Sequence, residues 1–517
     1  MPDKSTGKID LPNHEDAKDL IKGALVNYLG MIAKISKVIF VLVAARIYGP
    51  TALGLYLLAW SVIDIASKFG LWGFDRNLIR DIARFNIDDA QETRAKIFGI
   101  LRFNISIALG LSMLAAGIVF ILSDTIALKI FKDTNLVTPV KILSIALPFA
   151  VLTNLFLAAT KALRTMKYDV LIRQTLEPLV LLLATLALIP LSLGAVGLVT
   201  AHILASFVAA IGAAFVVFRK YRHLGWQSEP LPGAIKKETI RYIAPMGLME
   251  FLGLAAARLD IMLIGALLNS TSAGFYGIAV EIISIIKRVR QGFEPIFSTI
   301  VSELFYNQHK TRLQRNYVVV TRWLLGGSLL PFLVIVLYPA QLLVLFNKEA
   351  VIAASALMVL ALSHSLLSTF IGSETLLIMT GKTFLNTVLV AAMLAINGVV
   401  SVALIPKLGI TGAAVGMLSA YAFLSMARLF YGYRHYKLHP FGNALLWPLI
   451  TAAVTATVFS VVNFWLHVDS LAETIAIVIA VVIFYAGVYF LRATEAEEKH
   501  LIQKIMSKLR TPAIIRT

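Results

Sequence analysis

The sequence has 517 residues, of which 58% are hydrophobic and 15% are charged, and its mean hydropathy is +0.81. Soluble domains average roughly 45–50% apolar and about 25% charged residues, so the composition excludes an ordinary soluble protein. The lack of cysteine excludes disulfides and cysteine-bound metals, and we attribute the net charge of +18 to basic cytoplasmic loops rather than to nucleic-acid binding.

Residues 1–22 are predicted to be a polar cytoplasmic tail, because they lack the apolar core of a secretory signal peptide. Fourteen apolar segments follow, each close to the roughly 20 residues that a helix needs to cross a hydrocarbon core of about 30 Å. The first six segments span residues 24–47, 53–75, 98–122, 138–160, 171–190 and 195–218. The second six span residues 239–267, 273–298, 318–346, 352–380, 385–405 and 410–433. The last two span residues 443–466 and 471–492.

These segments predict an all-α, polytopic membrane protein with 14 transmembrane helices. We expect two pseudo-symmetric six-helix lobes and two further C-terminal helices. The predicted parts are a tail at 1–22, an N-lobe at 23–220, a cytoplasmic linker at 221–237, a C-lobe at 238–437, helices 13 and 14 at 438–494, and a cytoplasmic tail at 495–517.

An internal repeat supports the two lobes. The motif Ala187-Leu-Ile-Pro190 recurs as Ala403-Leu-Ile-Pro406, and each copy is followed by a glycine-containing turn. Gly54-Leu-Tyr56 is echoed by Gly274-Phe-Tyr276. Six helices per repeat is an even number, so both lobes face the same way, and a site between them near the membrane midplane is expected.

Lysine and arginine gather in alternate connections, at residues 76–96, 161–173, 219–241 and 310–315. The intervening connections hold few basic residues. Since cytoplasmic loops are enriched in lysine and arginine, both termini are predicted to be cytoplasmic.

Enzymatic motifs are not evident in the sequence. Gly381-Lys382-Thr383 resembles the end of a phosphate loop, but Leu376 stands where that loop requires glycine. The histidines lack metal-ligand spacing, and no nucleophile, base and orienting residue occur together. We therefore expect a transporter without catalytic residues, cofactor or metal.

Basic residues inside the predicted helices are candidates for function, because a charge near the bilayer centre costs at least about 2.5–3.5 kcal/mol. Lys34 and Lys37 share one face of the first helix. They either face a cavity or extend back to the inner surface from a helix that starts near Val38, which would then be too short to cross. Further along the chain, the candidates are Lys68, Arg258 and Arg288.

Acidic residues also occur in the predicted helices, namely Asp64, Glu250, Glu281 and Glu374. Asp64 and Lys68 share one face, so they form either an internal pair that lowers insertion cost or part of a functional stripe. The four acids are candidates for binding a coupling ion. Alternatively, they neutralise the basic residues.

Two stretches near the N-terminus resemble those of a known family. Arg46-Ile-Tyr-Gly-Pro50 with Thr51-Ala-Leu-Gly-Leu-Tyr56 is similar to the first inter-helix turn of the polysaccharide transporter family. Gly70-Leu-Trp-Gly73, leading to Arg80-Asp-Ile-Ala-Arg84, resembles the end of the second helix in that family. It belongs to the multidrug/oligosaccharidyl-lipid/polysaccharide exporter superfamily, and the predicted arrangement resembles it over nearly the whole chain.

The resemblance implies a flippase that moves undecaprenyl-diphosphate-linked oligosaccharides across the bacterial cytoplasmic (inner) membrane for O-antigen, capsule or exopolysaccharide synthesis. Alternating access of the two lobes would move the head group. The resemblance implies basic residues in a central cavity that receive the diphosphate. No family motif fixes their positions, and our candidates from the predicted helices are Lys34, Lys37, Lys68, Arg258 and Arg288. The implied partners are membrane lipids, a polysaccharide polymerase, glycosyltransferases and a coupling proton or sodium ion, and the protein is expected to be a monomer.

Three other functions stay open. A multidrug antiporter of the same superfamily predicts twelve helices and an acidic cavity, whereas the first helix here contains lysines. A lipid II-type flippase differs only in the sugar it moves. A membrane-embedded glycosyl-polymer synthase or ligase requires a large outer loop, and the outer connections here are short.

Overall fold

The computed structural model describes residues 35–85, 91–163, 165–222, 232–465 and 471–490. These residues form helices and contain no strand, which confirms the predicted all-α class. The chain divides into two compact units: unit 1 is Met1–Tyr48 with Ala59–Leu254, and unit 2 is Gly49–Leu58 with Ala255–Thr517. The predicted tails and most of the predicted linker lie outside the described residues.

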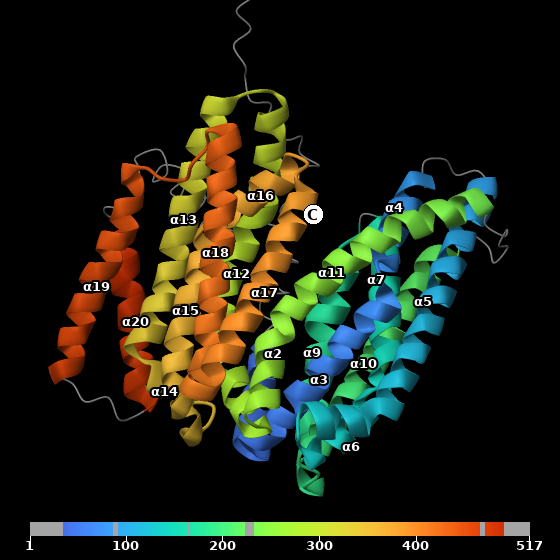
Figure 1. Cartoon of the computed structure of the whole chain (residues 1–517), viewed down its shortest axis with the longest axis horizontal. Coiled ribbons are helices and arrows are strands. Elements are labelled where there is room, and N and C mark those ends of the chain that lie inside the picture. The colour runs from blue at the N-terminus through green and yellow to red at the C-terminus, as the bar shows by residue number, and fades with distance from the viewer. Residues whose placement is uncertain (1–34, 86–90, 164, 223–231, 466–470, 491–517) are drawn as a thin grey trace, which may run out of the picture. The chain divides into compact units, whose positions relative to one another are not determined.

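The helices of unit 1 run alongside one another (Figure 1). They are α2 (Ile35–Val43), the π-helix η1 (Ala44–Tyr48), most of α3 (Gly49–Leu71), α4 (Phe74–Phe85), α5 (Gln91–Thr125), η2 (Ile126–Ile130), η3 (Thr134–Leu136), α6 (Val137–Leu143), α7 (Ala146–Ala162), α8 (Lys167–Asp169), η4 (Val170–Leu176), α9 (Glu177–Ala187), η5 (Ile189–Leu191), α10 (Ala195–Tyr221) and the first part of α11 (Gly233–Leu267).

Unit 2 begins with the first ten residues of α3 and takes up the chain again within α11. Its other helices are α12 (Ser270–Tyr306), α13 (Lys310–Leu337), α14 (Pro339–Val344), η7 (Lys348–Ala353), α15 (Ala354–Thr369), α16 (Ile371–Met379), α17 (Thr383–Leu408), α18 (Ile410–Tyr436), η8 (Asn443–Leu445), α19 (Leu446–Trp465) and α20 (Leu471–Val488).

Each of the fourteen predicted segments overlaps a described helix or pair of helices. Among the described residues, nine helices are long and apolar enough to cross a membrane, or ten if α6 and α7, which meet at 42°, form one span. Helices α11 and α12, of 35 and 37 residues, are long enough but contain several charged residues. The number of fourteen crossings therefore stays a prediction.

The separation of the first two predicted spans depends on Gly49. Its φ of +88° lies outside the helical region, in a conformation that favours glycine. Pro50 follows within the first turn of α3, where its missing N–H removes no helical hydrogen bond. The regular helix of α2 and η1 is thus interrupted where the sequence predicts a turn, and α3 begins anew.

Two predicted spans are divided in ways that the hydropathy pattern does not reveal. In the ninth, at 318–346, helix α13 ends at Leu337, because Pro339 cannot donate a helical hydrogen bond. The short helix α14 then begins at Pro339. The tenth, at 352–380, separates into α15 and α16 around Phe370.

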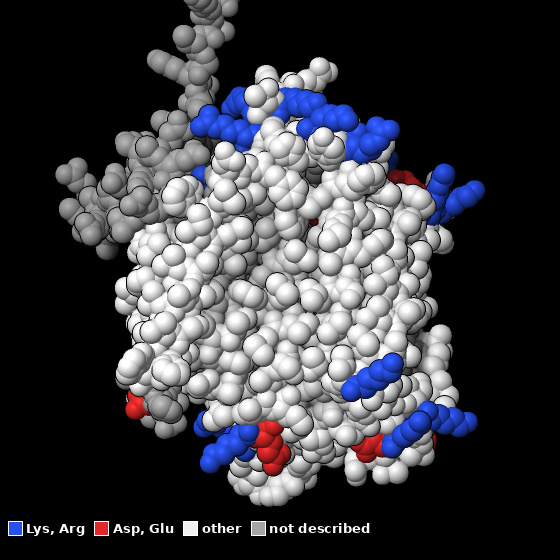
Figure 2. Space-filling view, turned by 60° about the vertical axis from the view of Figure 1, so that its left-hand side comes forward, with Lys and Arg blue, Asp and Glu red and all other residues white. Residues whose placement is uncertain are grey.

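The two C-terminal helices pack against α13 in unit 2. Tyr485 of α20 donates a hydrogen bond to the carbonyl oxygen of Gly326 at 2.8 Å, and Tyr338 at the end of α13 bonds Asn463 of α19 at 2.8 Å. Buried Leu329 and Leu333 add apolar contacts. Figure 2 shows a face whose middle is largely free of charged side chains, with lysine and arginine along its upper end and charged side chains of both signs toward its lower end, as expected for a protein surrounded by lipid.

The repeated Gly54 and Gly274 meet in unit 2. A Cβ atom on Gly54 would overlap the carbonyl oxygen of Ser270, and one on Gly274 would overlap that of Pro50. Thr51 and Thr271 share a 2.8 Å hydrogen bond, and they are 220 residues apart, as Gly54 and Gly274 are. Corresponding residues of the repeat thus contact one another, and only glycine permits so close an approach of α3 and α12.

Candidate functional site

A carboxylate held between two cations is the central feature of unit 1. Glu250 of α11 accepts a hydrogen bond from Lys68 Nζ of α3 at 3.0 Å through Oε2. Its other oxygen, Oε1, accepts from Arg76 Nε of α4 at 2.9 Å. The side chains of Lys68 and Glu250 are 24% and 18% exposed, and that of Arg76 is 59% exposed. We call these three residues the Glu250 triad.

Local sequence explains why these three side chains converge. Trp72 and Gly73, with φ of +29° and +81°, end α3 and allow α4 to begin one residue later. Lys68 and Arg76 therefore flank a sharp break in the chain. Gly247, one turn before Glu250, has no side chain, and a Cβ there would lie 2.8 Å from the indole of Trp72. This close packing brings α11 within reach of both cations.

A second group of charges continues along α4 and α11. Arg84 Nη1 lies 3.0 Å from Glu238 Oε1, and Arg80 Nη2 lies 3.6 Å from the same oxygen. The guanidinium of Arg80 also covers the ring of Tyr242 at 4.1 Å. Arg76, Arg80 and Arg84 are spaced four residues apart, so they share one face of α4 and meet the acids of α11 in turn.

Beneath these ion pairs lies a buried polar network. Asp81, 2% exposed, accepts hydrogen bonds from Asn77 Nδ2 at 2.9 Å and from Arg80 at 2.9 Å. Asn77 Nδ2 also bonds Asn104 Oδ1 of α5 at 3.0 Å. A buried carboxylate requires such partners, since an unsatisfied one costs several kcal/mol. The network joins α4 to α5 and supports the helix that presents Arg76.

Unit 2 contains a more deeply enclosed ion pair. Arg428 of α18, whose side chain is 2% exposed, donates from Nη1 to Glu374 Oε2 of α16 at 2.9 Å. Its Nε donates to Asn386 Oδ1 of α17 at 3.0 Å. Three helices thus share one arginine. Because Arg428 is almost wholly covered and bonds two other helices, it fits a role in packing better than one in contacting a ligand.

A second carboxylate in unit 2 is held by neutral groups. Asp260 of α11 is 4% exposed and accepts from the hydroxyl of Tyr276 at 2.8 Å and from Asn397 Nδ2 at 3.1 Å. Ser401 donates to Asn397 Oδ1 at 3.0 Å. A carboxylate in such surroundings is chemically suited to exchange a proton or a small cation.

Of the predicted candidates, Lys68 and Glu250 are in direct contact, and Glu374 contacts Arg428. Lys34 lies outside the described residues, and Lys37 is exposed on α2. The remaining candidates are placed as follows: Asp64 is half-buried on α3, Arg258 on α11 and Arg288 on α12, whereas Glu281 is buried on α12. Their roles in binding or coupling stay predictions.

Sequence reasoning did not select Arg76, Arg428 or Asn397, although each interacts with an intramembrane acid. Arg428 and Asn397 were detectable as polar residues within long apolar segments. Arg76 was assigned only to a cytoplasmic connection. Asp260 lies in the seventh predicted span, but nothing in the sequence indicates that its partners are 16 and 137 residues away.

Comparisons with known proteins address the family and the fold. The family model described as "Polysaccharide biosynthesis protein" matches residues 20–299, that is 280 of the 517 residues. The chain is similar in structure to the lipid II flippase MurJ in an inward closed conformation, with a TM-score of 0.67, 11% identity and coverage of 90% of this chain and 99% of the other.

Two further solved structures share the fold. One is an inward-facing multidrug resistance MATE transporter of the MOP superfamily, with a TM-score of 0.62 and 15% identity. The match covers 79% of this chain and 94% of the other. The other is a MOP superfamily transporter from Pyrococcus furiosus, described as having a binding pocket of reverse polarity. Its TM-score is 0.55 at 14% identity, and the match covers 80% of this chain and 94% of the other. No curated protein sequence matches the chain.

Proposed function

Because the chain belongs to the polysaccharide biosynthesis protein family, we propose that it is a flippase for undecaprenyl-diphosphate-linked oligosaccharides. It moves them across the bacterial cytoplasmic membrane, for O-antigen, capsule or exopolysaccharide synthesis, by alternating access of two lobes. The family match and the transporter fold support this proposal. The basic connections support the proposed orientation with both termini in the cytoplasm.

The Glu250 triad is the observation on which the substrate assignment rests. Lys68 and Arg76 hold a carboxylate at 3.0 and 2.9 Å, and all three side chains keep part of their surface open. A phosphate oxygen makes the same charge-assisted hydrogen bonds as a carboxylate oxygen. We expect the lipid diphosphate to displace Glu250 from both cations, so that the carboxylate offsets part of their positive charge until the substrate arrives.

Ion coupling is assigned differently from the sequence-based expectation. Glu250 and Glu374 are paired with cations, which supports a neutralising role for both. Asp260 is buried and its hydrogen-bond partners are neutral, so binding a proton or sodium ion relieves the electrostatic cost of a buried negative charge. We assign the coupling ion to Asp260, and Asp64 and Glu281 stay secondary candidates.

The experiment is complementation of bacterial strains that lack a flippase for a defined glycan, using Lys68→Ala/Arg76→Ala and Glu250→Gln variants. The double variant is expected to lose at least about 10-fold in surface glycan, since two charge-assisted contacts to the diphosphate are removed. Glu250→Gln is expected to bind undecaprenyl diphosphate more tightly and to release it more slowly. Lys129→Ala, at an exposed position of η2, is the control and should leave transport unchanged.

Several outcomes would contradict the proposal. Wild-type transport by the Lys68→Ala/Arg76→Ala variant, with the protein present at normal amounts in the membrane, removes the triad from substrate binding. Resistance to cationic drugs without rescue of any glycan identifies a multidrug antiporter instead. Rescue confined to a strain without its lipid II flippase identifies peptidoglycan precursor as the substrate.

A further inference from the structure

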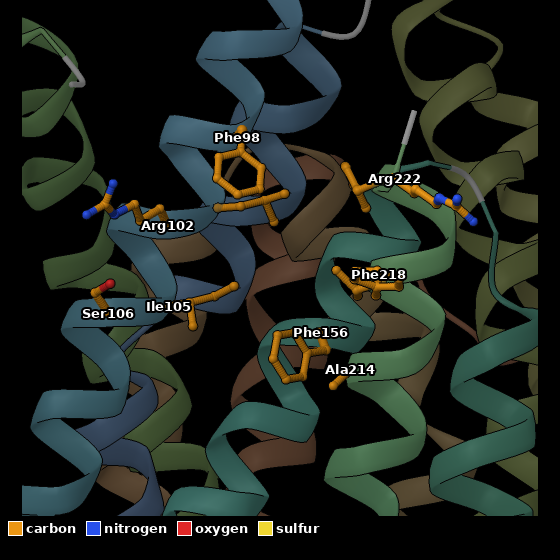
Figure 3. Close-up of a pocket in the computed structure, with 11 residues that line it drawn as sticks. Phe98, Arg102, Ile105, Ser106, Phe156, Ala214, Phe218 and Arg222 are labelled. Carbon is orange, nitrogen blue, oxygen red and sulfur yellow. The ribbon is translucent and has the colours of Figure 1, made fainter. Parts of the chain in front are cut away.

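An apolar cavity of about 560 Å³ opens in unit 1 between α5, α7 and α10. Its walls include the rings of Phe98 from α5, Phe156 from α7 and Phe218 from α10, which are labelled in Figure 3. The lining residues span Phe98 to Ser106 on α5 and Ala214 to Arg222 on α10, so the cavity is about 12 Å long at 1.5 Å per residue. Its size is that of an ordinary ligand pocket.

Two arginines border this apolar cavity. In Figure 3, Arg102 of α5 and Arg222 at the end of α10 lie on opposite sides of the rings, with their guanidinium groups directed outward. Both side chains are exposed. The pocket therefore combines walls that suit hydrocarbon with an exposed arginine on each side.

Arg102 occupies an unusual position in the sequence. It is the one charged residue between Lys96 and Asp124, and it interrupts an otherwise apolar run in α5. A charged residue on a membrane-spanning helix is costly unless it reaches polar groups, and a long arginine side chain reaches the lipid head groups from about one turn within the apolar region. An anion bound at the level of the lipid head groups would offset the cost of placing the Arg102 charge on this helix.

The packing beneath the cavity keeps its walls in place. Tyr221 of α10 is buried and donates a hydrogen bond to the carbonyl oxygen of Ala159 in α7 at 2.8 Å. Buried Leu157, Ala209 and Ala213 join the same two helices. These contacts fix two of the three helices that line the cavity. Binding then requires that the two exposed arginine side chains turn toward the opening of the cavity.

We propose that this cavity binds one anionic phospholipid, with an acyl chain against Phe98, Phe156 and Phe218 and the phosphate between Arg102 and Arg222. Basic pockets between membrane helices recognise anionic head groups, and each arginine near the surface contributes about 1 kcal/mol. The charge of the two arginines selects an anionic over a zwitterionic lipid, whereas the apolar walls accept the chain of either. The site is separate from the Glu250 triad and does not depend on the transported substrate.

The test uses the full-length protein in nanodiscs that contain a small fraction of phosphatidylglycerol with a photoreactive group in its acyl chain. Matched nanodiscs contain photoreactive phosphatidylcholine. We expect peptides covering residues 98–106 and 214–222 to be labelled mainly by phosphatidylglycerol. Arg102→Gln/Arg222→Gln should reduce that labelling roughly 10-fold or more, toward the phosphatidylcholine level, as expected from two contributions of about 1 kcal/mol.

Ala214→Trp fills the cavity and should abolish labelling by both lipids. Should this variant fail to fold, Ser106→Trp fills the same cavity from α5. The controls are Arg219→Gln, an exposed arginine one turn from Arg222 that does not line the cavity, and Ala453→Trp, at an exposed position of α19. Both should label as the wild type does. Equal labelling of the wild type by both lipids, or full labelling of the double arginine variant, would overturn the proposal.

Discussion

Two ion pairs made of the same kinds of side chain differ in their exposure. Arg428 is 2% exposed and is shared by Glu374 and Asn386, so its charge is satisfied within unit 2. Lys68 and Arg76, at 24% and 59% exposure, hold Glu250 at a surface that a ligand can reach. A buried pair of the first type contributes to the arrangement of helices, whereas an open pair can exchange its carboxylate for another anion.

The Arg428–Glu374 pair leads to a prediction about stability. Glu374→Gln leaves Arg428 buried without its counter-charge, and we expect a loss of about 2–3 kcal/mol in the free energy of unfolding. This lies below the roughly 3–5 kcal/mol known for fully buried pairs, because the Glu374 side chain is still 24% exposed. Thermal unfolding of the purified protein in detergent measures the change.

A double variant shows whether the lost stability of Glu374→Gln comes from the unpaired charge of Arg428. Arg428→Met/Glu374→Met removes both charges, and it should recover at least half of the stability lost by Glu374→Gln. A double variant less stable than Glu374→Gln would show that the pair provides more than mutual neutralisation. Glu349→Gln, at an exposed residue of η7, is the control and should leave unfolding unchanged.

Sequence reasoning identified single residues better than their partners. Lys68 and Glu250 were both selected as intramembrane charges, but for different roles, and their contact joins residues 182 apart. Spacing within one helix suggested Asp64 as the partner of Lys68, since local neighbours are all that a helical period reveals. Arg76 was missed because a positive-φ turn at Trp72 and Gly73 brings it back toward α3.

At the scale of elements, the contact of α3 with α12 depends on two glycines. Gly54→Ala or Gly274→Ala would place a Cβ atom on the carbonyl oxygen of Ser270 or Pro50, and backbone cannot move aside as a side chain can. We expect each variant to lose about 2 kcal/mol or more of stability and to reduce the amount of folded protein in the membrane. Size-exclusion chromatography with thermal unfolding measures both effects.

Gly110→Ala is the matched control for the two glycine variants. Gly110 lies within α5, and a Cβ there meets no atom within 4 Å. Since alanine favours helix more than glycine does by about 1 kcal/mol, this variant should be as stable as the wild type or more so. Normal stability of Gly54→Ala would mean that the two helices do not approach as closely as described.

Helix positions were predictable, but helix interruptions were not. Each of the fourteen apolar segments overlaps a described helix, because hydropathy averages over a whole segment, but the number of membrane crossings stays a prediction. The 42° bend between α6 and α7 and the ends at Tyr338 and Phe370 arise from local geometry and packing. The Gly54 repeat was visible in the sequence, yet its meaning as a contact between repeats required coordinates.

At the scale of the whole molecule, α11 takes part in both proposed activities. Its first part belongs to unit 1 and includes Glu250, and its second part belongs to unit 2 and includes Asp260. These carboxylates are ten residues apart in the sequence of this helix. Under the proposed function, one helix therefore bears both the group that the diphosphate displaces and the group that binds the coupling ion, which provides a direct physical link between the two events.

This link predicts the behaviour of Asp260→Asn. Asparagine keeps the size and much of the hydrogen bonding of aspartate but has no negative charge for a proton or sodium ion to neutralise, so ion binding should no longer alter α11. Transport by this variant in proteoliposomes should lose its dependence on a proton or sodium gradient, with gradient-driven flux falling at least about 10-fold. Binding of undecaprenyl diphosphate at the Glu250 triad should persist, because those residues are unchanged.

Two comparisons make the prediction specific to this carboxylate. Asp124→Asn, at an exposed position near the end of α5, should retain full gradient dependence. Tyr276→Phe removes one donor to Asp260 and raises the cost of its charged form, so that the ion concentration needed for half-maximal flux should change while the maximal flux persists. If Asp260→Asn still responds fully to the gradient, the coupling group lies elsewhere, and Glu281, which is buried on α12, becomes the next residue to substitute.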